Sequence, residues 1–166
     1  MTAWPMLGAL PGGKIRHAHR LSDTHGLLRA QASVALQGCD LIIHAGDIGK
    51  PEVLDALRQI APLQAIRGNV DVADWATALP EELDLEYEGR RLHVRHDLKT
   101  LAFDPAARGF AVVISGHSHK PSIERRDGVL YLNPGSAGPR RFRLPICLAL
   151  LELSAEGAAA QLIELS

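Results

Sequence analysis

The segment Leu41-Ile42-Ile43-His44-Ala45-Gly46-Asp47 places an aspartate directly after an apolar run, in a turn that contains glycine. A second apolar run, Leu63 to Ile66, is followed in the same way by Arg67-Gly68-Asn69. The intervening residues 51–60 begin with proline and are expected to form a helix. Strands that alternate with helices are typical of βαβ units, in which the strands are parallel. The carboxyl ends of parallel strands meet at one edge of a sheet, so Asp47 and Asn69 are expected to share a crevice.

Two histidine patterns flank this region, Asp23-Thr24-His25-Gly26 and Gly116-His117-Ser118-His119. In extended backbone, side chains two positions apart point the same way, so each pattern is expected to offer a pair of ligands. A fifth run, from Arg91, ends on a histidine at position 96. The candidate ligands are therefore Asp23, His25, Asp47, Asn69, His96, His117 and His119.

Seven nitrogen and oxygen ligands are too many for one tetrahedral zinc ion. They suit two ions ~3.5–4 Å apart that share a carboxylate. Because no cysteine belongs to the set, a thiolate zinc site or an iron–sulfur site is not expected.

The ordered set Ser-Asp-Thr-His-Gly, His-Ala-Gly-Asp, Arg-Gly-Asn, a lone histidine, Gly-His-Ser-His and Asn-Pro-Gly-Ser resembles the calcineurin-like metallophosphoesterases. The resemblance covers roughly residues 21–166 and is strongest to the small single-domain bacterial and archaeal phosphodiesterases, the YfcE-like family. It implies an α/β fold, a four-layer αββα sandwich of two facing mixed β-sheets flanked by helices.

The resemblance also implies how the ligands are divided. One ion would be held by Asp23, His25, Asp47 and His119, and the second by Asp47, Asn69, His96 and His117, with Asp47 bridging. Asp47, Asn69 and His96 are also expected to act in catalysis. Two divalent ions are expected as cofactors, with Mn²⁺ first and Fe²⁺, Zn²⁺ or Ni²⁺ as alternatives. A hydroxide that bridges the ions would hydrolyse a small phosphodiester substrate.

Two positions depart from the family pattern. Glycine usually follows the histidine that corresponds to His96, but Asp97 stands here. Elsewhere in the superfamily a histidine often follows the metal-binding asparagine and protonates the leaving group, but here that position is Val70. Since this proton donor is missing, activated aryl phosphodiesters are expected to be better substrates than alkyl phosphomonoesters.

Composition limits the other function classes. The chain has 166 residues, 46% of them hydrophobic, which fits one globular domain with a substantial core. Its net charge of −1 gives no field that favours nucleic acid or an anionic membrane. No run approaches the ~18 apolar residues of a membrane span. Cys39 and Cys147 do not form a disulfide framework, which favours a cytoplasmic protein.

Residues 1–14 are expected to form a flexible N-terminal extension, and residues 15–166 a single domain. The sequence leaves open whether the protein forms a homo-oligomer. The rival hypothesis is a non-catalytic scaffold of the same fold that serves protein interaction, but a scaffold has no need of all seven candidate ligands.

The expected strands are 15–22, 40–45, 62–66 and 110–115, with hairpins over 83–96, 122–132 and 146–164. Helices are expected at 28–37, 51–60 and 100–108. The first strand is unusually polar, with His17 and His19 on one face and Arg16 and Arg20 on the other. Burial of such groups without partners is costly, so a distorted and weakly held strand is expected. The alternative is that the histidines are neutral and hydrogen-bonded while the arginines reach solvent. His44 is expected to support the site rather than bind metal.

Overall fold

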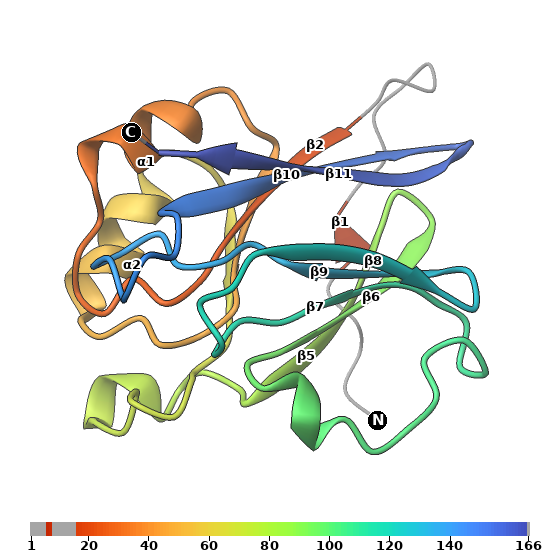
Figure 1. Cartoon of the computed structure of the whole chain (residues 1–166), viewed down its shortest axis with the longest axis horizontal. Helices are drawn as coiled ribbons and strands as arrows, with labels where there is room; N and C mark the ends of the chain where they lie inside the picture. The colour runs from red at the N-terminus through yellow and green to blue at the C-terminus, as the bar shows by residue number, and fades with distance from the viewer. Residues whose placement is uncertain (1–5, 8–15, 166) are drawn as a thin grey trace.

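The computed structural model describes residues 6–7 and 16–165, which form two facing β-sheets (Figure 1). The five-stranded sheet has the order β11 (Gly157–Glu164), β10 (Cys147–Ser154), β2 (Arg16–Leu21), β3 (Leu41–His44) and β4 (Leu63–Ala65). The six-stranded sheet has the order β1 (Met6–Leu7), β5 (Glu82–Tyr87), β6 (Arg90–Arg95), β7 (Phe110–Ile114), β9 (Val129–Asn133) and β8 (Ser122–Arg126). The helical segments are α1 (Ala30–Ala35), α2 (Pro51–Arg58) and the short 3₁₀ helices η1 (Asp74–Ala76) and η2 (Leu98–Thr100).

The pairing of the strands confirms the predicted βαβ order of the first half, because β2, β3 and β4 are parallel neighbours. The three predicted hairpins are present as β5–β6, β8–β9 and β10–β11. The second half also contains parallel pairs, since β7 pairs in parallel with both β6 and β9. The carboxyl ends of β6 and β7 therefore also meet at one edge, as those of β2 to β4 do.

The main core lies between the two sheets. The five-stranded sheet contributes Ala18, Ile43 and Leu151, and the six-stranded sheet contributes Leu85 and Val112 among others. The alternate residues of the five-stranded sheet, such as Ile42 and Leu148, face the opposite way and pack against α1 and α2. Figure 1 shows both helices grouped on this side. The predicted sandwich of two facing mixed sheets with outer helices is thereby confirmed.

The outer face of the six-stranded sheet has a thinner cover than expected. The prediction of a helix at 100–108 is wrong, because η2 ends at Thr100 and is followed by a single hydrogen-bonded turn. The amide of Phe110 bonds back to the carbonyl of Pro105, and Gly109 ends the turn with a φ of 76°. Phe103 from this segment packs edge-on against His93 of β6, with ring centroids 4.9 Å apart.

The polar first strand, β2, is regular although it lies in the middle of its sheet. It pairs with β10 on one side and with β3 on the other. The pairing shows no distortion, whereas the weakness of the strand stays a prediction. Arg20 does not reach solvent, because it is fully buried. Its Nη1 lies 3.4 Å from the carbonyl oxygen of His19, while its Nε and Nη2 have no hydrogen-bond partner among the described residues. Burial lowers the pKa of Arg20 to about 9.

The predicted N-terminal extension is described only at Met6–Leu7, which pair in parallel with β5. The rest of residues 1–14 lies outside the described residues. Within the described part of the chain, no helix is long and apolar enough to span a membrane.

Candidate functional site

Three of the predicted ligands follow neighbouring parallel strands of the five-stranded sheet. Asp23 follows β2, Asp47 follows β3 and Asn69 follows β4. The loops are tied to each other by backbone hydrogen bonds, because the amide of Asp23 donates to Gly46 O and that of His25 to Asp47 O, both at 3.0 Å. The sheet edge therefore sets these side chains side by side.

The other sheet brings the remaining histidines to the same place. His96 follows β6, and His117 and His119 follow β7. The amide of Gly116 donates to the carbonyl of His96 at 2.9 Å, which joins these two loops. Six of the seven predicted ligands thus form two groups of three, and Asn69 contacts His117 of the second group.

The loops that carry these residues are left-handed rather than extended. The φ values are 55° at Asp23, 46° at His25, 56° at Asp47, 70° at His117 and 62° at His119. Such values are rare for residues other than glycine and concentrate at functional sites. The expectation that residues two apart in extended backbone point the same way is therefore wrong, and His117 and His119 enter different groups.

The close approach of the loop after β4 to the loop after β3 requires glycine at position 68. A Cβ at Gly68 would overlap the backbone amide and the carboxylate of Asp47. The loop after β4 can therefore lie against Asp47 only because this residue has no side chain.

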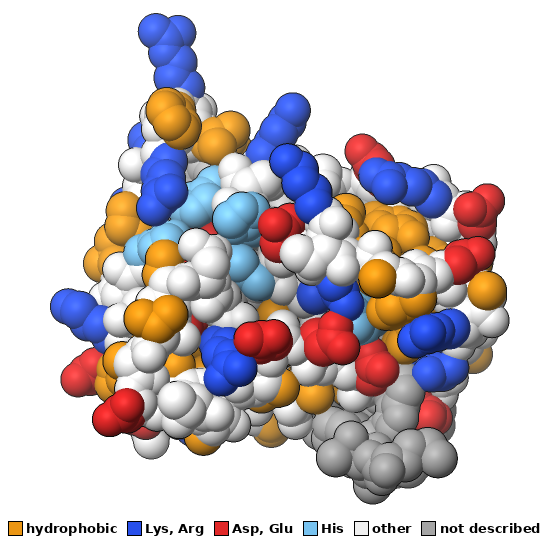
Figure 2. Space-filling model, turned by 90° about the horizontal axis from the view of Figure 1, so that it is seen from below, with side chains coloured by type: hydrophobic (Ala, Val, Ile, Leu, Met, Phe, Trp, Pro, Cys, Tyr) orange, Lys and Arg blue, Asp and Glu red, His pale blue; other side chains and the backbone are white. Residues whose placement is uncertain are grey.

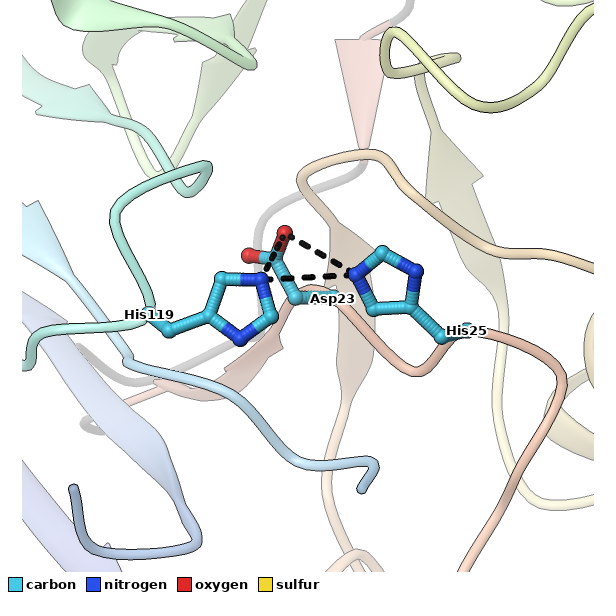
Figure 3. A group of neighbouring side chains, drawn as sticks. All are labelled: Asp23, His25 and His119. Carbon is cyan, nitrogen blue, oxygen red and sulfur yellow. Dashed lines mark hydrogen bonds and ion pairs between the residues drawn. The ribbon is translucent and has the colours of Figure 1, made fainter. Parts of the chain in front are cut away.

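The first ligand group consists of Asp23, His25 and His119 (Figure 3). Both Nε2 atoms point toward Asp23 Oδ1, at 3.8 Å from His25 and 3.3 Å from His119, and lie 3.4 Å from each other. The two rings stack with centroids 5.2 Å apart. The other carboxylate oxygen of Asp23 accepts hydrogen bonds from Ser22 Oγ at 2.7 Å and from the amide of His117 at 3.1 Å. Burial lowers the pKa of His119.

The second group consists of Asp47, His96 and His117, with Asn69 beside them. Asp47 Oδ2 lies 3.1 Å from His96 Nε2 and 3.7 Å from His25 Nε2, so it faces both groups. His117 Nδ1 lies 3.1 Å from Asn69 Oδ1. Burial raises the pKa of Asp47, but His96 and the N–H of Val70 outweigh it and lower the pKa to about 2.

The protonation of His96 follows from its contacts. Its Nδ1 lies 2.7 Å from the carbonyl oxygen of Ala45, which can only accept, so Nδ1 carries a hydrogen. In the neutral ring, Nε2 then directs a lone pair toward Asp47 Oδ2 and Asp23 Oδ1, the latter at 3.8 Å. Burial lowers the pKa of His96, but these carboxylates and the Ala45 carbonyl outweigh it and raise the pKa.

This arrangement fits a bound cation. Among the described residues, the buried Asp23 Oδ1 and His96 Nε2 have no hydrogen-bond partner, although they lie 3.8 Å from each other and His96 Nε2 lies 3.1 Å from Asp47 Oδ2. A positive charge between these atoms would satisfy all of them at once. Each of the two groups offers three ligand atoms within 4.8 Å of one another, so each could hold an ion.

His44 has a supporting position, as expected. Its Nδ1 accepts from the amide of Gly46 at 3.1 Å, so Nε2 carries the hydrogen and donates to Thr24 Oγ1 at 2.9 Å. Thr24 in turn donates to the carbonyl of Ile48 at 2.9 Å. Burial lowers the pKa of His44 to about 4, so the ring is neutral near pH 7.

Asp71 is a supporting residue that the sequence analysis missed. Its buried carboxylate accepts from the amides of Ile48 at 3.0 Å, Gly49 at 2.9 Å and Gly68 at 2.8 Å. It therefore joins the loops that carry Asp47 and Asn69. The sequence feature that could have identified Asp71 is its position in the same polar turn as Asn69, two residues later.

The Asn-Pro-Gly-Ser turn also supports the site. The side-chain amide of Asn133 donates to Gly116 O at 3.0 Å and Ser118 Oγ at 3.1 Å, which holds the loop between His117 and His119. Ser136 Oγ donates to the carbonyl of Asp23 at 3.0 Å. Arg67 forms an ion pair with the exposed Glu81 at 3.2 Å.

The site opens to the surface at its second group. Figure 2 shows histidine side chains gathered in one patch, bordered by both basic and acidic side chains. The His117 side chain is 45% exposed, whereas that of His119 is 5% exposed. A cavity of about 1130 Å³ begins here and is lined by Asn69, His96 and His117 together with residues from the loops after β4 and β6.

Comparison with known proteins agrees with this geometry. The calcineurin-like phosphoesterase superfamily domain matches residues 18–156. A probable metallophosphoesterase of Methanothermobacter thermautotrophicus is 31% identical over 155 residues, which cover 86% of this chain and 89% of that protein.

Two solved structures show the same fold at low sequence identity. Vacuolar Protein Sorting 29 of Cryptosporidium parvum has a TM-score of 0.73 at 17% identity, covering 92% of this chain and 98% of that one. Yfce, a phosphoesterase from E. coli, has a TM-score of 0.64 at 20% identity, covering 90% and 100%. Since the family domain spans the strands and loops that carry every candidate ligand, the chain belongs to the calcineurin-like phosphoesterase superfamily.

Proposed function

We propose that this protein is a phosphodiesterase that depends on two divalent metal ions. The observation that carries the proposal is the convergence of two carboxylates and four histidine rings in which Asp23 Oδ1 and His96 Nε2 are buried and have no hydrogen-bond partner among the described residues. One ion is assigned to Asp23, His25, Asp47 and His119. The other is assigned to Asp47, Asn69, His96 and His117.

The bound ions would supply an activated water molecule and neutralise negative charge on the phosphate. The chain itself supplies the alignment. Asp47 faces both groups, and its second carboxylate oxygen is fixed by the amide of Val70 at 3.1 Å. Asp23 is fixed through Ser22, and His96 through the Ala45 carbonyl. Hydrogen bonds of this kind orient ligands and typically contribute 10–100-fold to metal affinity or activity.

Directly after Asn69, where a histidine could protonate the leaving group, the chain has Val70. This residue is 43% exposed. A general acid typically contributes about 10²–10⁴-fold. The proposed substrates are therefore diesters with a stable leaving group, such as aryl phosphodiesters, and Mn²⁺ is the proposed metal with Fe²⁺, Zn²⁺ and Ni²⁺ as alternatives.

The second candidate is a scaffold for protein interaction. The structural likeness to Vacuolar Protein Sorting 29 is the observation that favours it. That likeness extends to the fold alone, because only 17% of the residues are identical. A scaffold does not require five strained ligand positions, and this favours the enzyme.

The test is a metal-reconstitution assay. The protein is freed of metal with chelator and measured with bis(4-nitrophenyl) phosphate and 4-nitrophenyl phosphate, before and after addition of Mn²⁺, Fe²⁺, Zn²⁺ or Ni²⁺. We expect activity only with metal, and a higher kcat/KM for the diester. Equal activity without metal, or no activity with any metal, would refute the proposal.

A further inference from the structure

The cavity beside the second ligand group is large enough to receive part of a substrate. Its volume is about 1130 Å³, and its wall includes Asn69, His96 and His117. If a phosphodiester binds at the proposed ions, one of its two ester substituents will therefore point into this space. The rest of the wall then decides which substituents are accepted.

Most of the charged side chains in this wall are already neutralised. Arg67 pairs with Glu81, and Arg95 pairs with Glu82 and also donates to Thr100. These contacts place a carboxylate against each arginine of the wall.

Asp71, a further carboxylate of the wall, is also occupied. It receives three backbone N–H groups and is 3% exposed, so it cannot meet a ligand directly.

Asp97 is different. Its side chain is 32% exposed and lines the cavity next to His96. One carboxylate oxygen accepts from the amide of Lys99 at 3.0 Å. The other lies 3.9 Å from His117 Nε2, beyond hydrogen-bond distance. The cavity therefore presents a partly exposed carboxylate beside His96 and His117, where the second ion would bind.

We propose that the cavity receives one ester substituent of the phosphodiester, and that Asp97 selects substituents with a positive charge, such as amino-alcohol esters. Substituents that carry a second phosphate or a carboxylate are disfavoured by repulsion from the same group. The inference rests on the proposed phosphodiesterase activity and adds the class of substrate to it.

The test uses a pair of substrates that differ only in charge. 4-Nitrophenyl phosphocholine carries a quaternary ammonium, and 3,3-dimethylbutyl 4-nitrophenyl phosphate has a carbon atom in its place. Both release 4-nitrophenolate, so the chemical step is matched. We expect the wild-type protein to prefer the choline ester in kcat/KM by about fivefold to tenfold at low ionic strength, and less at high salt.

The Asp97→Asn variant should reduce that preference to near unity, because asparagine keeps the oxygen that accepts from Lys99 but has no charge. The matched control is Asp74→Asn, at an exposed carboxylate that is not part of the cavity wall. Its loss should change the preference by less than about twofold. Metal content is measured in every variant.

The outcomes separate the two proposals. Wild-type activity with no preference for the choline ester overturns the inference, whether or not any variant folds. A preference that survives in Asp97→Asn also overturns it. Absence of activity on both diesters overturns the proposed function together with this inference.

Discussion

Arg20 is a charged group buried in the middle of the sheet, and its replacement by methionine is expected to stabilise the protein. Burial lowers the pKa of Arg20 to about 9, and at 1.36 kcal/mol per pKa unit this costs about 5 kcal/mol relative to an exposed arginine. This is the cost of keeping the side chain charged at neutral pH. Methionine refills most of the volume, and replacement of buried charges by apolar groups typically gains roughly 1–4 kcal/mol. We expect a gain in that range for Arg20→Met, or roughly 2–4 °C in Tm per kcal/mol.

The assay is urea unfolding of the metal-free protein, followed by circular dichroism. Because burial lowers the pKa of Arg20 in the folded state, the unfolded chain binds more protons above pH 9, so the stability of the wild type relative to Arg20→Met should improve as the pH rises above 9. Arg58→Met is the matched control, since Arg58 is exposed on α2 and should change stability by less than about 0.5 kcal/mol. A loss of more than about 1 kcal/mol in Arg20→Met would mean that Arg20 is stabilising where it lies, and that the reasoning is wrong.

Three further changes probe the support of the site. Because burial lowers the pKa of His44 to about 4, the free energy of unfolding of the metal-free protein should fall by about 3 kcal/mol as pH falls from 6.5 to 4. In urea unfolding, His44→Asn should reduce this dependence on pH. An unchanged pH profile in the variant would contradict the prediction. Asp71→Ala should lower the free energy of unfolding by about 3 kcal/mol and weaken metal binding measured by calorimetry, because three backbone N–H groups lose their acceptor. The control Asp74→Asn, at an exposed residue, should change neither quantity. Val70→His should raise kcat/KM for alkyl diesters more than for aryl diesters, and an equal rise for both would show that leaving-group protonation is not what the site lacks.

The site could be predicted from the sequence because its residues follow apolar strands. The strands β3 and β4 are short apolar runs, and the chain order places Asp47 and Asn69 at their carboxyl ends. The same rule gives the positions of His96 and His117, although it does not give their conformation. Left-handed backbone at non-glycine residues is imposed by contacts between loops from two sheets, which a local pattern does not contain.

Other features depend on tertiary contacts and were missed for that reason. Asp71 acts on amides that lie up to 23 residues away in the chain, so its role follows from the packing of two loops. The segment around Pro105 has a helical composition, but Gly109 and the return to β7 leave room for only one turn. The polarity of β2 was evident in the sequence, whereas its regular pairing is set by β3 and β10 on either side.

The most direct test of the account is the metal content and diesterase activity of Asp47→Ala beside the wild type, with Cys39→Ser as control. Asp47 faces both ligand groups, whereas Cys39 lies outside them. We expect two ions per chain in the wild type and in Cys39→Ser, and loss of at least one ion with a fall in kcat/KM of more than about 100-fold in Asp47→Ala. An Asp47→Ala protein that keeps both ions and the wild-type rate would contradict it.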